Sequence, residues 1–191
     1  AGNDIIINYS TSSKYYGNNS SLNGGDGNDF ISNRGNTSTL NGGDGDDTLS
    51  DYAFYSRFIG GKGNDYIHLF KTKRENEEVV IYNTGDGNDY VTGFDRTSKL
   101  IIGGGSGTYF FEKSGNDIVV TVGEDKITLA GAANLSTVNI AGKLEPIAVE
   151  DSIDNDLSGV SIAGNDSANT IKNSGANVTI IGNGGNDSIS N

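Results

Sequence analysis

The chain has 191 residues, a formal net charge of −12 and a pI of about 4.3, so we expect no nucleic-acid partner, because binding phosphates needs a basic surface. Its 29 glycines do not fall at every third position, which excludes collagen, and the absence of cysteine excludes disulfides and cysteine-ligated zinc. Hydrophobic residues make up 34% of the chain in short β-branched runs, which favours a folded protein, and no apolar run is long enough for membrane insertion.

The most regular feature of the sequence is a repeated glycine–aspartate motif. It reads "LNGGDGNDFIS" at 22–32 and "LNGGDGDDTLS" at 40–50, continues as "GGKGNDYIH" at 60–68, and has lost only its first glycine in "TGDGNDYVT" at 84–92. Truncated or shifted copies are "AGNDIII", "SGNDIVV", "AGNDSANTI" and "GNGGNDSIS", and the last of them ends the chain inside a repeat, so we expect a fragment or a processed product.

The spacing of the motif predicts the architecture. Asp29, Asp47 and Asp65 follow one another at intervals of 18 residues, and Asp89 follows Asp65 after 24, so an insertion is expected at the charged run "KTKRENEE". A period of 18 suits one solenoid coil of two short strands and two turns, stacked on the next at about 4.8 Å. We therefore predict an all-β fold, a parallel β-roll or β-solenoid, with these apolar side chains pointing inward: Ile31, Leu40, Leu49, Ile59 and Ile67.

The predicted organisation has four parts. Residues 1–92 form the glycine–aspartate repeats of the β-roll, 93–142 a β-rich cap or connector, 143–157 a linker with the single proline, and 158–191 the start of a second repeat array. The alternation in "IVVTVGEDKITL" predicts a hairpin around 123–126, and no segment has the period of a helix.

Stacked coils would bring the motif aspartates together on one edge. Two such charges about 5 Å apart repel by roughly 1 kcal/mol in water and roughly 3 kcal/mol at an effective dielectric of 20, so a line of them opposes folding. A hard cation bound between the carboxylates would make the electrostatic energy of this arrangement favourable. Calcium accepts a mixture of about 6–8 carboxylate and carbonyl oxygens, which two stacked glycine turns offer, whereas magnesium prefers strict octahedral geometry and retained waters.

The motif resembles the calcium-binding nonapeptide of the repeats-in-toxin (RTX, hemolysin-type) family, glycine-glycine-x-glycine-x-aspartate-x-apolar-x. The resemblance covers most of 24–92 and, more weakly, 164–191. It implies a parallel β-roll with several calcium ions between successive turns, export by a type I secretion system, extracellular or cell-surface use, and folding triggered by calcium. In the regular form of the family both edges carry the motif. Here alternate turns read "NRGN", "DYAFYSRF" and "NSGAN", so calcium is expected mainly on one edge.

The resemblance also implies a set of calcium ligands. The carboxylates are those of Asp29, Asp47, Asp65 and Asp89, while Asp4 and Asp187 would need partners from missing or distant coils. The main-chain carbonyls would come from the motif glycines Gly25, Gly27, Gly43, Gly45, Gly61, Gly63, Gly85 and Gly87. Asp117 and Asp166 are weaker candidates because their glycine turns are short, and we expect the third-position acids Asp26, Asp44 and Asp86 to face solvent rather than bind the metal.

Two interpretations of function remain open from the sequence. In the first, the chain is a calcium-dependent structural module of a larger secreted or cell-surface repeat protein, an adhesin stalk or fibre whose partners are calcium and neighbouring repeats or protomers joined end to end. In the alternative, it is a carbohydrate-binding or accessory module of a secreted RTX-type enzyme, with the aromatics of "YAFYSRF" either stacking on extracellular glycans or packing locally. The only histidine, His68, has no nucleophile beside it in the sequence pattern, so we predict no catalytic residues and no enzyme activity.

Overall fold

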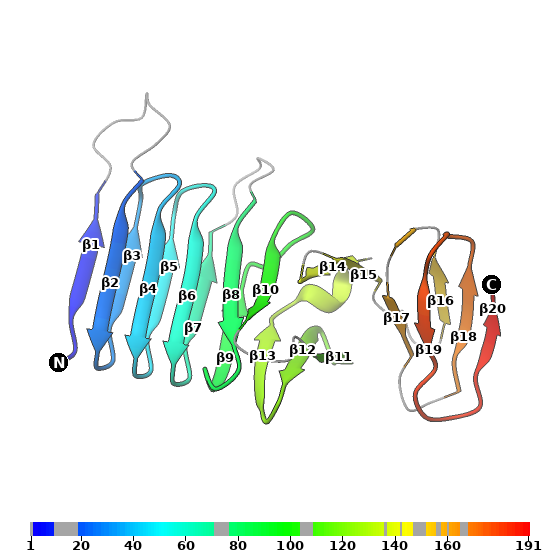
Figure 1. Ribbon diagram of the computed structural model, residues 1–191. Coiled ribbons are helices and arrows are strands. Elements are labelled where there is room, and N and C mark those ends of the chain that lie inside the picture. The colour runs from blue at the N-terminus through cyan, green and yellow to red at the C-terminus, as the bar shows by residue number, and fades with distance from the viewer. Residues whose placement is uncertain are drawn as a thin grey trace.

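The computed structural model describes residues 2–9, 19–70, 77–103, 109–135, 137–141, 143–146, 152–155, 158–159, 161–164 and 168–191, and the chain in these ranges is almost entirely β-structure. Two long sheets face each other and form a roll (Figure 1). Sheet A has the strand order β1 (Ile5–Asn8), β3 (Phe30–Asn33), β5 (Thr48–Asp51), β7 (Tyr66–Leu69), β9 (Asn88–Thr92), β13 (Asp125–Leu129), β12 (Asp117–Val122) and β11 (Phe110–Ser114). Sheet B has the order β15 (Lys143–Pro146), β14 (Thr137–Ile140), β10 (Lys99–Gly103), β8 (Val79–Asn83), β6 (Arg57–Lys62), β4 (Thr39–Asp44) and β2 (Ser21–Asp26).

The strands of the repeats are parallel and in register with the predicted period. β3 pairs with β5 so that Ile31 lies beside Leu49, and β5 pairs with β7 so that Leu49 lies beside Ile67. The chain alternates between the two sheets at every turn, which is the winding of a β-roll. The predicted all-β parallel roll is therefore confirmed.

The core of the roll is a line of apolar side chains between the sheets. Ile31, Leu40, Leu49 and Ile67 are fully buried, as predicted from their spacing. The prediction was wrong for Ile59, because Phe58 pairs with Leu40 and is fully buried, whereas Ile59 pairs with the outward Asn41 and is partly exposed. Both residues are apolar, so only the strand register decides which one points inward.

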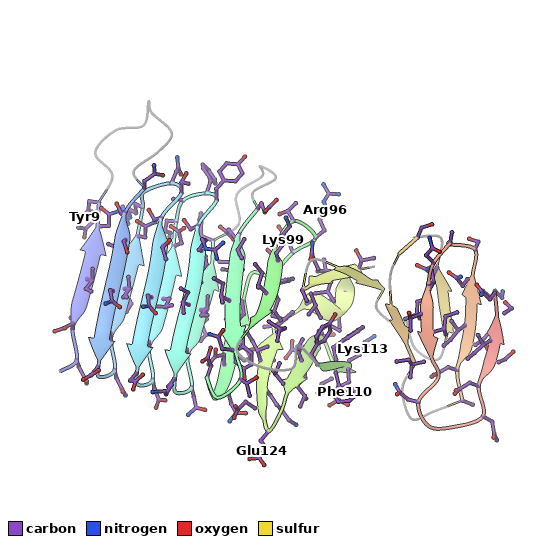
Figure 2. The ribbon with its side chains drawn as sticks, viewed as in Figure 1. Tyr9, Arg96, Lys99, Phe110, Lys113 and Glu124 are labelled. Atoms are coloured by element: carbon purple, nitrogen blue, oxygen red, sulfur yellow. The ribbon has the colours of Figure 1, made fainter. Side chains whose placement is uncertain are left out.

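Residues 93–142 extend both sheets of the roll. β13 pairs in parallel with β9, and β14 pairs in parallel with β10. The predicted hairpin is confirmed: β12 and β13 are antiparallel and join at Gly123, whose φ is +68°. Glu124 lies at the tip of this hairpin (Figure 2). The one helix among the described residues is a short 3₁₀ turn, Ala132–Asn134.

The segment predicted as a linker contains strands. β15 pairs antiparallel with β14, and β16 (Ser152–Asn155) already belongs to the second stack of coils. In that stack β16 pairs with β18 (Thr170–Asn173), and β18 pairs with β20 (Ser188–Ser190). Its second sheet consists of β17 (Ser161–Ala163) and β19 (Thr179–Ile181). Pro146 and the acids around it resembled a loop, but the sequence analysis overlooked the pattern of Ile153 and Asn155.

The edge of the roll opposite the glycine–aspartate turns is held by a ladder of buried amides. Asn8 Nδ2 donates to Asn33 Oδ1 at 2.7 Å, and Asn33 Nδ2 donates to Asp51 Oδ1 at 2.9 Å. Asn33 also closes its own turn, donating to the Gly35 carbonyl and accepting from the Gly35 amide. The second stack repeats the device between Asn155 and Asn173 at 2.6 Å. These turns lack the glycine–aspartate motif, but their side-chain amides hold successive coils together by hydrogen bonds.

Replacing Asn33 tests this ladder. Asn33→Ala leaves the Asn8 amide, the Asp51 carboxylate and both main-chain groups of Gly35 without their partner, so we expect the free energy of unfolding to fall by about 3 kcal/mol. The matched control is Asn41→Ala, which removes an exposed bond to Asn23 and should cost less than about 0.5 kcal/mol. Urea unfolding of both variants measures the difference, and equal losses would show that the ladder contributes nothing special.

Candidate metal centre

The four glycine–aspartate turns lie along one edge of the roll, the lower edge in Figure 1. Three of them connect β2 to β3, β4 to β5 and β6 to β7, and the fourth connects β8 to β9. The motif aspartates are buried although the turns are at the surface: Asp29, Asp47, Asp65 and Asp89 are only 2–4% exposed. The structure thus brings together the four carboxylates that the sequence selected.

The carboxylates form a ladder through one oxygen each. The Asp29 amide donates to Asp47 Oδ1 at 2.7 Å, the Asp47 amide to Asp65 Oδ1 at 2.8 Å, and the Asp65 amide to Asp89 Oδ1 at 3.0 Å. The Asp4 amide begins the series by donating to Asp29 Oδ1 at 2.7 Å. Each aspartate therefore anchors the preceding coil.

The second carboxylate oxygen has no protein partner. Oδ2 of Asp29, Asp47 and Asp65 is buried and makes no hydrogen bond. A buried anionic oxygen without a donor is costly, so it calls for a positive partner.

The first glycine of the motif allows this oxygen to approach the backbone closely. A Cβ built on Gly42 would collide with Oδ2 of Asp47 and lie 2.5 Å from the carbonyl oxygen of Gly60 in the next coil. The equivalent atom on Gly24 would collide with Oδ2 of Asp29 and lie 2.6 Å from the carbonyl oxygen of Gly42. A carboxylate oxygen and a carbonyl oxygen therefore converge on the same point in successive coils. Sequence analysis assigned ligands to later glycines of the motif and missed Gly42 and Gly60.

The later motif glycines are required by the stacking of the turns. Gly43 has a φ of +120°, and a Cβ there would collide with the Gly25 carbonyl of the preceding coil. Gly61 has the same relation to Gly43, at a φ of +108°. The backbone at these positions adopts a conformation that side chains disfavour, and neighbouring turns approach too closely for any Cβ. The predicted ligands Gly25, Gly43 and Gly61, like Gly27, Gly45 and Gly63, thus lie in two continuous stacks of carbonyls.

Burial raises the pKa of several carboxylates in the ladder. Desolvation, followed by repulsion from neighbouring aspartates, raises the pKa of Asp65 to about 7 and that of Asp89 to about 8. Burial raises the pKa of Asp47 as well. Burial in the fold therefore favours the protonated form of these groups, and a bound cation would oppose that shift.

The fourth turn differs from the other three. Phe58 and Ile59 pair with Val80 and Ile81, yet Asp65 meets Asp89, so the turn is two residues longer here. Tyr82 is the first of the inserted residues, fully buried, and its hydroxyl donates to the Gly87 carbonyl. The hydroxyl therefore already binds one of the carbonyls predicted as a metal ligand.

Two further expectations change at this turn. The predicted ligand Gly85 is not stacked on the preceding coil, because a Cβ there would meet nothing within 4 Å. The expectation that Asp86 faces solvent was wrong, since this carboxylate is 6% exposed and accepts hydrogen bonds from the amide and side chain of Asn83. Asp26 and Asp44 are exposed as expected, and Asp44 pairs with Lys62 at 3.0 Å. The sequence predicted a nearly intact copy of the motif at "TGDGND", because the two inserted residues come before these letters and leave them unchanged.

The second stack has a mixed version of the ladder. The Asn169 amide donates to Asp187 Oδ1 at 3.0 Å, 18 residues away, so Asp187 bonds to the adjacent coil, whereas a missing or distant coil was predicted. A Cβ on Gly164 would collide with Asn169 Oδ1 and lie 2.5 Å from the Gly182 carbonyl, which repeats the arrangement at Gly42. Sequence analysis missed Asn169 because it searched for acids, although the interval of 18 identifies the position.

The remaining candidates lie outside the two ladders. The Asp117 carboxylate accepts from the Gly131 amide at 2.8 Å and is not part of the column. Asp166 is outside the described residues. The main-chain amide of Asp4 donates to the ladder, and Asp4 itself is exposed at the start of the stack.

The donor set fits a hard cation. In the described part of the chain no three His, Cys, Asp or Glu side chains converge, so main-chain carbonyls must supply part of any coordination shell. At Gly24 and at Gly42 a cradle combines a buried carboxylate oxygen without a partner and a nearby carbonyl of the next coil, which is the mixture that calcium accepts, whereas at Gly60 the nearest atoms all belong to Asp65. Fold and site together define a parallel β-roll with a column of carboxylate and carbonyl oxygens along one edge. No helix in the described ranges is both long and apolar enough to cross a bilayer.

Comparison with known proteins finds similarity at the level of structure. No family model and no curated protein matches the chain. Among solved structures, the extracellular lipase LipA from Serratia marcescens contains a similar region, with 20% sequence identity and a TM-score of 0.45. The match covers 69% of this chain but only 18% of the lipase. At this score the likeness carries no argument about function.

The raised pKa values predict how pH acts on the metal-free protein. Because the folded pKa of Asp65 and Asp89 lies above the ordinary value of 3.8, their contribution to stability is complete below about pH 4 and is lost as pH rises through 7 to 8. Protein stripped of metal with a chelator should therefore show a melting transition at pH 5.5 that weakens or disappears by pH 8.5. A melting temperature that rises over this interval would contradict the burial of unpaired carboxylates.

A single methyl group tests the cradle. Gly42 does not have a positive φ, so Gly42→Ala adds a Cβ without backbone strain and places it between Asp47 Oδ2 and the Gly60 carbonyl. We expect the calcium concentration at the midpoint of a titration to rise at least about tenfold, which corresponds to about 1.4 kcal/mol. The neighbouring Asn41→Ala, which points away from the column, is the control, and an unchanged midpoint for Gly42→Ala would remove this position from the site.

Proposed function

We propose that this chain is a calcium-dependent structural module of a larger secreted or cell-surface repeat protein. The observation that carries the proposal is the column of buried Oδ2 atoms of Asp29, Asp47 and Asp65, which have no protein partner and face the space beside the glycines of the motif. The resemblance of the same residues to the RTX nonapeptide supports calcium as the cation.

Calcium would act here as a folding cofactor rather than a reagent. When bound, it supplies positive charge and accepts oxygens from two coils at once. Asp29, Asp47 and Asp65 would hold it with the carbonyls of Gly42, Gly60 and the stacked motif glycines. Oxygen ligation without strict octahedral geometry favours calcium over magnesium. Because the binding free energy of such a site is also folding free energy, the roll would be ordered where calcium is abundant.

This dependence supports a place outside the cell. Sites built from few charged ligands bind calcium weakly and are filled at about 10⁻⁴–10⁻³ M, the range of extracellular modules. Each coil offers one buried carboxylate per cradle, which fits this class. The role as an adhesin stalk or fibre, with neighbouring repeats or protomers continuing the stack, follows from the linear architecture and the edge strands β1 and β2.

A role without catalysis is also part of the proposal. The buried aspartates have structural partners: Asp47 and Asp65 anchor the preceding coils, and Asp51 closes the amide ladder. Nδ1 of His68 bonds to the hydroxyl of Thr92 at 2.8 Å, on the outward side of sheet A. These groups are fixed by the stack rather than directed into a common site.

Removal of calcium tests the function directly. Circular dichroism during a calcium titration should show that the β signal and the cooperative melting transition at pH 7.5 appear only with calcium. Magnesium at the same concentration is the control and should not restore them. A chelated protein with its full β signal and melting temperature would rule out a structural role for calcium.

The ligand assignment has its own test. Asp47 lies in the middle of the ladder and contacts two coils, whereas Asp26 is exposed on the same edge. Asp47→Asn should raise the calcium midpoint at least about tenfold, or about 1.4 kcal/mol, while Asp26→Asn leaves it within a factor of about two. Equal effects of the two substitutions in calorimetric titrations would refute the assignment.

A further inference from the structure

The outward face of sheet A is unlike the rest of this acidic chain. Over β1, β3, β5, β7 and β9 the outward side chains lie in rows that cross the strands, because parallel neighbours pair residue by residue. None of the outward positions within these strands carries a formal charge, although the chain has 25 acidic residues. These positions are Ile5, Ile7, Phe30, Ser32, Thr48, Ser50, Tyr66, His68, Asn88, Tyr90 and Thr92.

One row on this face is aromatic. Phe30, Tyr66 and Tyr90 occupy equivalent positions on β3, β7 and β9, and each is 41–42% exposed. The rings of Tyr66 and Tyr90 stack with their centroids 6.0 Å apart and their planes 17° from parallel. Thr48 lies between Phe30 and Tyr66, so these two rings are two strand spacings apart, or about 9.6 Å.

A polar row follows two residues further along the strands. It consists of the half-buried Ser32, His68 and Thr92 and of Ser50, which is only 9% exposed. His68 and Tyr66 both contact the Thr92 hydroxyl, at 2.8 Å and 3.5 Å, so these groups are already positioned without a ligand. Hydroxyl and imidazole groups both donate and accept hydrogen bonds, as the hydroxyls of a sugar do.

A second aromatic row borders the polar row on its other side. It contains Tyr9, Arg34, Tyr52 and Phe70, each in the first position after its strand. The Arg34 guanidinium lies over the rings of Tyr9 and Tyr52, at 5.6 and 5.5 Å, and the rings of Tyr52 and Phe70 are 5.1 Å apart. Tyr9 lies at the upper end of the roll, away from the glycine–aspartate turns (Figure 2). Two aromatic rows thus enclose a row of hydrogen-bonding groups.

We propose that this face binds a linear, uncharged polysaccharide that lies along the stacking axis. The apolar C–H face of a pyranose ring packs on an aromatic ring, while its equatorial hydroxyls reach groups such as those of the polar row. A polymer suits the face because the same pattern recurs coil after coil. A net charge of −12 repels polyanions, and it also opposes the close pairing of two copies of this chain.

The proposal goes beyond the structural function and relocates the sugar contacts that the sequence suggested for "YAFYSRF". In that segment Phe58 is fully buried and Tyr55 protrudes from a turn outside the rows, and only Tyr52 belongs to the face. Tyr55 therefore serves as a matched control, because it is as exposed as the proposed contacts.

Affinity electrophoresis in calcium-containing gels tests the proposal. The chain should be retarded by at least one of laminarin, xylan and dextran and not by the polyanion alginate. Tyr66→Ala with Tyr90→Ala should weaken the apparent affinity at least about tenfold, since stacking on each ring contributes measurably. Tyr52→Ala with Phe70→Ala should have the same effect from the other row, and Tyr55→Ala should have none.

Several results would overturn the proposal. These are no retardation by any neutral polymer, retardation by alginate alone, or a loss on Tyr55→Ala that the row variants do not share. A dimer detected by light scattering that the Tyr66/Tyr90 substitutions dissolve, without retardation, would assign the face to a second copy instead. Calcium titration of the same samples by circular dichroism tests the structural function separately from the polysaccharide site. Calcium-dependent folding without retardation refutes only the polysaccharide site. Retardation with calcium-independent folding refutes only the calcium role.

Discussion

The buried carboxylates of one edge determine the stability of the whole stack. Asp29, Asp47 and Asp65 each use one oxygen to hold the coil before, and each leaves the other oxygen buried without a donor. The apolar core of the roll is thin, because each strand contributes few buried apolar side chains. Hydrophobic burial therefore does little to offset the free-energy cost of the buried carboxylates. Under the proposed function, a cation between the turns would turn a repulsive line of charges into an attractive contact between coils. The fold and the ion would then form one thermodynamic unit.

The two edges of the roll solve the same problem in different ways. On one edge, stacked aspartates and glycine carbonyls make a column for a charged partner. On the other, Asn8, Asn33 and Asp51 bond to one another directly and need no ion. Over β1, β3, β5, β7 and β9 the outward strand positions of sheet A between these edges carry no formal charge, whereas other strands do carry charged residues, such as Arg57 on β6 and Lys99 on β10. This separation leaves a flat aromatic and hydroxylated surface on a strongly acidic molecule.

The sequence alone predicts the parallel roll and the carboxylate ladder, because both depend on an 18-residue interval that insertions in loops do not disturb. It does not predict that Phe58 rather than Ile59 is buried, since both are apolar and one residue of register separates them. Tyr82 was overlooked for a similar reason: two extra residues widen the turn while the motif letters survive. The amide ladder could have been found, because Asn155 and Asn173 repeat at the same interval of 18. Asn169 was missed because the search considered charge rather than position.

The aspartate ladder gives the stack a direction. The amide of each motif aspartate is satisfied only by the carboxylate of the coil that follows it in the chain, from Asp4 through Asp65. The series ends at Asp89, beside which β13 places the apolar Ile127, and the antiparallel hairpin closes the sheet there. An ordered coil thus offers a ready acceptor to the coil before it, but no equivalent acceptor to the coil after it. Coils can therefore be added one at a time from the hairpin toward the N-terminus, because each added coil presents the carboxylate that accepts from the next coil to be added.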